Sequence, residues 1–190
     1  MTQAVNMQLA SFLTYLCDIL FVLVDCGIDG SVYFKHTNKC YKLYNEVTLA
    51  WYDARWNCRE MGRNGDLASI SDFATQNFIK GNFNFTSWTW FGGRAKVAKG
   101  YWKWVDGSEW LYDNWRSGYP SDRYEREVAT VIDASYIWYD QQIAYNIKYW
   151  SLCQYQVSTE TQNEDTCTRS NSIPNKVVPF VNDINDTDIQ

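Results

Sequence analysis

The sequence predicts an α+β fold with two helices, small antiparallel sheets and a long irregular loop, because helix-type and strand-type patterns both occur in it. Residues 101–105 form a predicted strand, since Trp102 and Trp104 alternate with other side chains and the polar run 106–108 supplies a turn directly afterwards. Residues 49–61 form a predicted helix, in which apolar side chains recur at helical spacing. The two patterns together predict the mixed class.

The length and composition indicate a single globular domain. A chain of 190 residues with 10 Trp, 14 Tyr and 9 Phe has enough apolar surface for a sizeable core. The net charge is −5 and no basic stripe is present, which argues against a nucleic-acid-binding protein. Residues 157–190 hold six Asp and Glu against two Lys and Arg, so they form a predicted disordered acidic tail.

The first residues have the composition of a secretory leader. Residues 9–24 are almost wholly apolar and are interrupted by Asp18. A membrane-spanning helix needs about 20 apolar residues, so a stable membrane anchor is the less favoured alternative. Residues 1–26 are therefore interpreted as a signal peptide or hydrophobic leader, and the predicted location is secreted and extracellular.

The cysteines indicate disulfides rather than a metal site. They are widely spaced and accompanied by a single histidine, His36, which does not fit a zinc site. Together with the apolar leader they favour an oxidising compartment, although many pairings are open and reduced, buried thiols are the alternative. The six are Cys17, Cys26, Cys40, Cys58, Cys153 and Cys167.

The first half of the domain predicts a hairpin and two helices. Residues 32–44 alternate aromatic and polar side chains, which is typical of a hairpin. Thr48 is the predicted cap of the helix at 49–61, whose spacing points Cys58 into the core. Ser71 is the predicted cap of a second helix that runs to about Lys80.

The second half predicts short strands around an aromatic loop. Gly92 and Gly93 allow a close approach of two backbones, and residues 127–132 and 136–139 are short strand candidates. Trp110, Tyr112 and Trp115 follow no regular spacing, so they are expected to pack against each other in a long loop.

Several motifs in this half occur in a characteristic order. The Gly-rich stretch 90–93 is followed by W-x-W-x-D-G at 102–107, by the Asn-Trp pair at 114–115 and by the loop that contains Pro120. Residues 65–70 add the segment G-D-L-A-S-I. With these motifs the chain resembles the C-type lectin-like domain from about Cys26 to Tyr155. The resemblance implies that residues 27–156 form one such domain, with 150–155 as its closing strand.

The resemblance also implies the disulfide pattern. It pairs Cys58 with Cys153 as the core disulfide, and in the longer form of the family it pairs Cys26 with Cys40. Cys40 with Cys167 is the alternative. Cys167 otherwise has no obvious partner, which leaves a disulfide-linked dimer or a free thiol open.

The family's calcium ligands are largely replaced in this sequence. Members that bind sugar through calcium use a Glu-Pro-Asn or Gln-Pro-Asp loop, a nearby Glu and a Trp-Asn-Asp strand. The matching triplets here are 119–121, Tyr-Pro-Ser, and 138–140, Trp-Tyr-Asp. Calcium requires oxygen ligands, and Tyr119 offers neither a carboxylate nor an amide. Weak or absent calcium binding is therefore expected. Pro120 is also explained as a residue that fixes the conformation of the loop, which could include a cis peptide bond.

The comparison with the family also indicates a missing disulfide and two sets of candidate residues, one for ligand binding and one for a shifted calcium site. Ala129 and Ile143 stand where the family has a short disulfide, so the binding loops are expected to be more mobile. The candidate ligand-binding residues are Tyr119, Pro120, Ser121, Asp122, Glu127, Trp138 and Asp140. A shifted calcium site would use at most Asp122, Glu125, Glu127 and Asp140.

Four aromatic side chains on or near the loop are open to three interpretations. Tyr119, Tyr124, Trp110 and Tyr112 could stack on a sugar ring, anchor a protein interface or pack the loop against itself. The predicted function is extracellular carbohydrate binding with a degenerate calcium site. The alternative is calcium-independent binding of a protein through residues 107–127.

Neither catalysis nor cofactor chemistry is predicted. His36 is the single histidine, and the motifs G-x-S-x-G and H-E-x-x-H do not occur. Paired carboxylates such as Glu125 and Glu127 are typical of an exposed strand face. Asn84 and Asn185 begin glycosylation sequons, which predicts a glycoprotein if the chain is exported.

Overall fold

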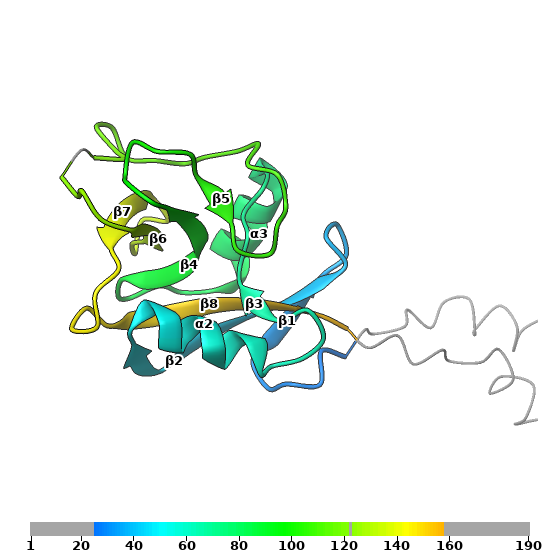
Figure 1. Ribbon diagram of the computed structural model, residues 1–190. Helices are drawn as coiled ribbons and strands as arrows, with labels where there is room; N and C mark the ends of the chain where they lie inside the picture. The colour runs from blue at the N-terminus through cyan, green and yellow to red at the C-terminus, as the bar shows by residue number, and fades with distance from the viewer. Residues whose placement is uncertain (1–24, 122, 158–190) are drawn as a thin grey trace, which may run out of the picture. The chain divides into compact units, whose positions relative to one another are not determined.

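The computed structural model describes residues 25–121 and 123–157 (Figure 1). The predicted leader up to residue 24, the predicted tail from residue 158, Cys17, Cys167, Asn185 and Asp122 lie outside the described residues. No helix within the described ranges has the length and apolar composition needed to cross a membrane.

Within residues 25–121 and 123–157, eight strands form one mixed sheet, which together with two helices confirms the α+β class (Figure 1). The strand order is β1-β2-β8-β4-β6-β7, with β3 paired to β8 and β5 paired to β4. All pairs are antiparallel except β4 with β8, where Thr89 aligns with Trp150 and Trp90 with Ser151. The strands are β1 (Ser31–Phe34), β2 (Lys39–Leu49), β3 (Asp66–Leu67), β4 (Thr89–Ala95), β5 (Lys103–Trp104), β6 (Val128–Ile132), β7 (Trp138–Gln142) and β8 (Tyr149–Gln156).

The first helix, α2 (Trp51–Arg59), buries the face that its spacing predicts. Trp51, Ala54 and Cys58 are each 0% exposed. The predicted cap is wrong, because Thr48 still belongs to β2 and the N-cap residue is Ala50, which makes no side-chain capping hydrogen bond. Tertiary packing of the buried face, rather than a cap, therefore stabilises this helix.

The second helix, α3 (Phe73–Asn82), begins two residues after the predicted cap. Its N-cap is Asp72, whose Oδ1 accepts a hydrogen bond from the Thr75 backbone N–H at 2.6 Å. The Asp72 carboxylate also lies 3.0 Å from His36 Nε2. Ser71 was wrongly predicted as the cap, since Ser and Asp are comparable capping residues and the sequence places them side by side.

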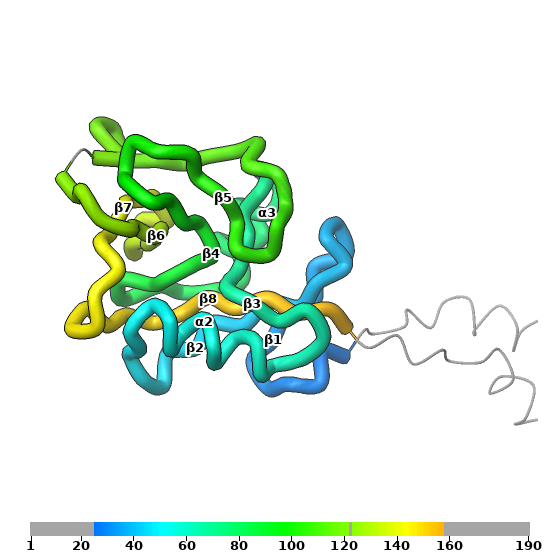
Figure 2. The backbone as a smooth tube through the Cα atoms, in the orientation of Figure 1, coloured from blue at the N-terminus to red at the C-terminus, as the bar shows by residue number. Residues whose placement is uncertain are grey.

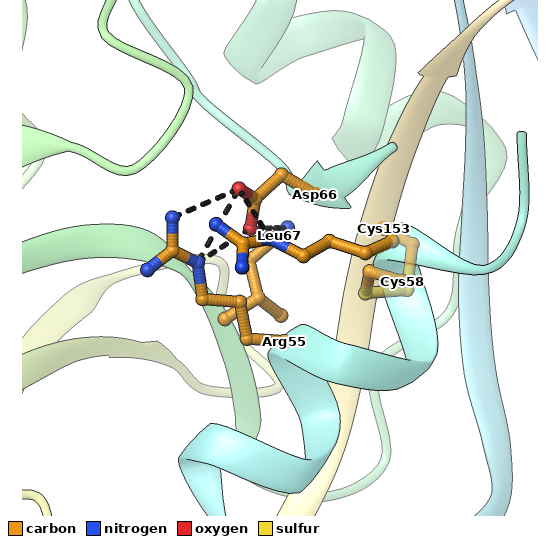
Figure 3. Close-up of a disulfide and its surroundings, with 6 residues drawn as sticks. Arg55, Cys58, Asp66, Leu67 and Cys153 are labelled. Carbon is orange, nitrogen blue, oxygen red and sulfur yellow. Dashed lines mark hydrogen bonds and ion pairs between the residues drawn. A yellow bond between two sulfur atoms is a disulfide. The ribbon is translucent and has the colours of Figure 1, made fainter. Parts of the chain in front are cut away.

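The two predicted disulfides are present. Cys58 in α2 is bonded to Cys153 in β8, with 5.2 Å between their Cα atoms, and Cys26 is bonded to Cys40 in β2. The bond between Cys26 and Cys40 excludes the alternative pairing of Cys40 with Cys167. Figure 3 shows the first bond fastening α2 against β8, beside the ion pair between Arg55 and Asp66.

The Trp-rich stretch forms a much shorter strand than predicted. Only Lys103 and Trp104 pair with β4, opposite Arg94 and Gly93. Trp104 is 3% exposed, whereas Tyr101 is 93% exposed. A Cβ atom on Gly92 would lie 2.6 Å from the Leu67 carbonyl oxygen, which confirms the predicted close backbone approach.

Trp138 in β7 is the centre of the aromatic core. It is 0% exposed, and its indole Nε1 donates to Gln76 Oε1 at 3.0 Å. Five rings surround it with centroid distances from 5.0 Å to 6.0 Å. Three of the five come from the loop. Two of these, Trp110 and Trp115, also stack on each other with 6.2 Å between their centroids, which agrees with the predicted self-packing of that loop. The five rings belong to Phe91, Trp104, Trp110, Tyr112 and Trp115.

A partly buried polar network ties the turn after β5 to β8. Asp106 Oδ2 accepts hydrogen bonds from Ser69 Oγ and Gln154 Nε2, both at 2.7 Å, and lies 3.0 Å from Lys39 Nζ. Its other oxygen accepts from the Ser108 hydroxyl at 2.6 Å. Burial acts to raise the pKa of Asp106, but the hydroxyls of Ser108 and Ser69 and the Lys39 ammonium outweigh it and lower that pKa well below its ordinary value.

Replacing Asp106 with Asn is expected to reduce the free energy of unfolding at pH 7 by about 1.5–3 kcal/mol, because it removes charged hydrogen bonds. The pKa of Asp106 is lowered by folding, so its ionised carboxylate stabilises the fold at pH values above 3.8, the ordinary pKa of Asp. This stabilisation is lost progressively as the pH falls below 3.8. Urea unfolding of both proteins between pH 7 and pH 2 would measure the difference. A difference that stays constant down to pH 2 would contradict the assignment.

Candidate functional site

Hydrogen bonds within the protein hold the loop around Pro120 against β7. The Tyr119–Pro120 peptide bond is cis. Ser121 donates twice to Asp140, from its backbone N–H to Oδ1 at 2.6 Å and from its hydroxyl to Oδ2 at 2.9 Å. Asp140 is only 3% exposed, so both of its carboxylate oxygens already have a partner within the protein.

Tyr119 packs on the protein rather than projecting from it. Its ring meets the Tyr139 ring edge-on, with 4.9 Å between the centroids. The Tyr139 hydroxyl accepts a hydrogen bond from Arg116 Nη1 at 2.8 Å and donates to Asp133 Oδ2 at 2.9 Å. This chain of contacts holds the loop at the edge of β7 and leaves Tyr119 half-buried.

Glu127 is engaged in a different direction from Asp140. Its Oε2 accepts a hydrogen bond from the Tyr52 hydroxyl of α2 at 2.5 Å, and its Oε1 is ion-paired with Arg94 of β4. Burial acts to raise the pKa of Glu127, but the hydrogen bonds from Tyr52 and Arg94 outweigh it and lower that pKa. Ser121 and Asp140 therefore lie together, whereas the Glu127 side chain is bound to Tyr52 of α2 and Arg94 of β4 instead.

The remaining candidate residues are distributed between the core and the surface. Trp138 lies in the core, where no ligand could contact its ring. Glu125 is exposed, and Asp122 is outside the described residues. Ala129 and Ile143 lie in one apolar cluster, so packing takes the place of the family's short disulfide.

The four loop aromatics are half-buried, which agrees mainly with packing of the loop against itself. Trp110 stacks on Trp104 with 4.3 Å between the ring centroids. Tyr124 packs beside Trp102 against a small apolar cluster. Leu111 is the most exposed large apolar side chain of loop 107–121, at 76%.

A profile of the family described as "Lectin C-type domain" matches residues 47–173. This chain belongs to the C-type lectin domain family. The C-type lectin lectoxin-Lio3 of Erythrolamprus poecilogyrus is 35% identical over 133 residues, which cover 66% of this chain and 80% of that protein.

Solved lectin domains share the fold. The C-type carbohydrate-recognition domain of cow CD23, solved in the presence of a GlcNAc2Man3 oligosaccharide, is 26% identical with a TM-score of 0.58, covering 68% of this chain and 95% of that one. A calcium-independent type II antifreeze protein is 24% identical with a TM-score of 0.58, covering 68% of this chain and 93% of that one, and shows the fold alone.

The residues of this lectin domain do not fit a calcium ion at the family's loop. Calcium takes six to eight oxygen ligands, and here both oxygens of Asp140 accept hydrogen bonds from Ser121 while Glu127 is bound to Arg94 and Tyr52. Among residues 25–121 and 123–157, no group of three or more His, Cys, Asp or Glu side chains is placed to hold a metal ion. Glu125, Glu127 and Asp140 therefore do not gather into the shifted site.

The lectin domain also has a groove that the motifs did not indicate. It has a volume of about 680 Å³ and lies beside α2 and the β4–β5 hairpin. The signal in the sequence is the run 94–103, RAKVAKGYWK, in which Arg94, Lys96, Lys99 and Lys103 occur without a carboxylate. The groove-lining residues are Arg55, Arg94, Ala95, Lys96, Val97, Gly100, Tyr101, Lys103, Trp104, Val105 and Glu127.

Proposed function

We propose that this chain is an extracellular glycan-binding domain that does not use calcium at the loop around Pro120, and that it is a binding protein without catalytic activity. Membership of the C-type lectin family supports recognition as its task. The observation that carries the calcium-independent part is the pair of hydrogen bonds from Ser121 to Asp140. They occupy the carboxylate that would otherwise face an ion.

The proposed contact surface combines half-buried rings with polar groups of the same loop. Tyr119 and Tyr124 are each half-buried, and Arg116, whose backbone carbonyl accepts a hydrogen bond from the Tyr119 N–H, is exposed. Aromatic rings pack on the apolar faces of ligands, while hydroxyl and guanidinium groups hydrogen-bond to polar ones. Sugars carry both kinds of surface, so the loop offers contacts that need no ion. The proposed glycan-contacting residues of the loop are Tyr119, Pro120, Ser121 and Asp122.

An extracellular location belongs to the same proposal. Two disulfides within the described residues are typical of an oxidising compartment. Asn84 and Thr86 of the first sequon are both exposed, so an attached glycan would meet no packed side chain there. Treating the secreted protein with a glycosidase should reduce its mass. An Asn84→Gln variant should show no such reduction, and both results together would support this assignment.

The alternative function is calcium-independent binding of a protein surface through the same loop. The exposed side chain of Leu111 favours it, because an apolar group in solvent at a loop tip can anchor a partner. A Leu111→Ser variant separates the two possibilities. Loss of a protein partner with unchanged glycan binding would support the alternative.

Calcium is expected to produce no saturable change in tryptophan fluorescence up to millimolar concentration. Trp110 and Trp115 belong to the loop and pack against Trp138, so their fluorescence would report an ion there. On a glycan array, binding is expected to be equal with and without a chelator. Abolition by the chelator would contradict the proposal.

A pair of variants locates the glycan contact. Tyr119→Ala is expected to lower glycan affinity about tenfold, which corresponds to the loss of one stacked ring. Tyr145→Ala is the matched control, since Tyr145 is 78% exposed and lies outside the loop. Equal effects of the two substitutions would place the contact elsewhere.

A further inference from the structure

We infer that the groove beside α2 is a second binding site, which takes an anionic saccharide carrying sulfate or carboxylate groups. We call it the basic groove, defined by Arg55, Arg94, Lys96, Lys103 and Tyr101. Neither Ser121 nor Asp140 lines it, and the other described loop residues proposed above, Tyr119 and Pro120, do not line it either. The inference therefore does not depend on the loop site.

Two guanidinium groups in the basic groove are held in place by the fold. Arg55 donates to both oxygens of Asp66, at 2.9 Å and 3.0 Å, and to the Val105 carbonyl oxygen at 3.2 Å. Arg94 is ion-paired with Glu127. Both guanidinium carbons lie over the buried ring of Trp51, at 5.7 Å for Arg55 and 5.4 Å for Arg94. Such preorganised groups lose little entropy when they bind an anion.

Donors remain available for a ligand. The hydrogen bonds of Arg55 and Arg94 use Nε and Nη2, and within the described part of the chain Nη1 of neither residue has a recorded partner. Lys96 and Lys103 are exposed and form no ion pair with any described residue. Four cations thus line the groove. Glu127 offsets the charge of Arg94 and Asp66 that of Arg55, so Lys96 and Lys103 carry the net positive charge. This balance favours carboxylate and sulfate groups.

The wall of the groove offers an aromatic ring next to these charges. Tyr101 is 93% exposed, and Val97 beside it is 42% exposed, above a floor that includes Trp104. The segment that carries Tyr101 is anchored, because Trp102 Nε1 donates to the Ala98 carbonyl oxygen at 2.9 Å and Ala98 is buried. An exposed ring on an anchored segment can stack on the apolar face of a sugar.

Size and shape favour a saccharide over an acidic peptide. A volume of about 680 Å³ lies within the range of compact-ligand sites. Charge and a stacking ring are combined within one concavity, which suits a short oligosaccharide whose rings carry anionic substituents. A peptide that binds by adding a strand would need a row of free backbone groups along a strand edge, and β5, with only two residues, offers a short one.

The test uses a heparin-derived hexasaccharide as the probe and isothermal titration calorimetry of the full chain. Maltohexaose is the neutral control, and hexaglutamate is the peptide control. The sulfated hexasaccharide is expected to bind more tightly than either, with an affinity that falls as salt is added because the lysines are solvent-exposed. Equal binding of maltohexaose would overturn the anionic assignment, and equal binding of hexaglutamate would overturn the saccharide assignment.

Matched variants locate the site. The double substitution of Lys96 and Lys103 with Gln is expected to lower hexasaccharide affinity about tenfold, since it removes two charged contacts. Substituting Lys35 and Lys148 with Gln changes the net charge equally but alters no groove-lining residue, and less than a twofold change is expected. Equal losses in the two double variants would overturn the proposed location.

Two further variants separate this site from the loop and from general attraction of charge. Tyr101→Ala is expected to lower affinity about tenfold without changing the net charge, which simple electrostatic attraction would not produce. Tyr119→Ala is expected to leave hexasaccharide binding unchanged. If Tyr119→Ala lowered hexasaccharide affinity and Tyr101→Ala did not, the anionic ligand would bind the loop instead. If only the loop proposal failed, Tyr101→Ala would still lower hexasaccharide affinity.

Discussion

Replacing both Cys58 and Cys153 with Ala is expected to reduce the free energy of unfolding by about 5 kcal/mol. The bond joins residues 95 positions apart, so its loss releases a long loop in the unfolded chain. It also fastens α2 to β8, and α2 has no side-chain cap to hold it otherwise. Because domains of this size are stable by about 5–15 kcal/mol, the variant should be close to unfolding, and urea denaturation would measure it.

The second disulfide provides the matched control for this prediction. Replacing both Cys26 and Cys40 with Ala removes a bond that spans only 14 positions, so a smaller loss of about 3 kcal/mol is expected. The two double variants remove the same atoms. If the loss for Cys26 and Cys40 equals or exceeds that for Cys58 and Cys153, loop length does not set the stability.

Substituting Trp138 with Ala is expected to reduce the free energy of unfolding by about 3–5 kcal/mol. Trp138 is 0% exposed, and the substitution would leave a cavity lined by rings from β4, β5 and the loop. It would also leave Gln76 Oε1 without the indole donor at 3.0 Å. Thermal unfolding followed by near-ultraviolet circular dichroism reports both the stability and the loss of ordered rings.

Trp56 serves as the control for the same chemical change. It lies on the outer face of α2 and is 67% exposed, so Trp56→Ala is expected to change the stability by less than about 0.5 kcal/mol. If Trp138→Ala were as mild as this control, the aromatic core would not be organised around Trp138. If Trp56→Ala were as severe, that ring would be packed against something in solution.

The sequence predicted those elements whose signal is local. The spacing of Trp51, Ala54 and Cys58 placed the buried face of α2. The core disulfide, which joins distant residues, was implied only by the resemblance to the C-type lectin-like domain. Boundaries were less accurate where one pattern runs into the next. Thr48 has the chemistry of a cap, but strand pairing carries β2 through Leu49, and the pairing determines the backbone conformation at Thr48.

The candidate site was predicted only in part, because its contacts depend on which way side chains point. The sequence places Glu127 near Asp140 along neighbouring strands, but Tyr52 and Arg94 draw Glu127 toward α2. Strand 136–139 was also misplaced, since Tyr136 has a φ of 61° and belongs to the preceding turn. The basic groove combines residues from a helix, a strand and a hairpin, so no single stretch reveals it.

The two ends of the described domain meet across β2 and β8, as the tube in Figure 2 also shows. Gln156 pairs with Lys39, and the Tyr155 hydroxyl donates to the Cys26 carbonyl oxygen at 2.9 Å. Neighbouring ends of this kind allow a domain to be spliced into a surface turn of another protein, or to be reconnected by a short linker and opened elsewhere. This domain could therefore be displayed as an insert, entering and leaving its host at nearly one point.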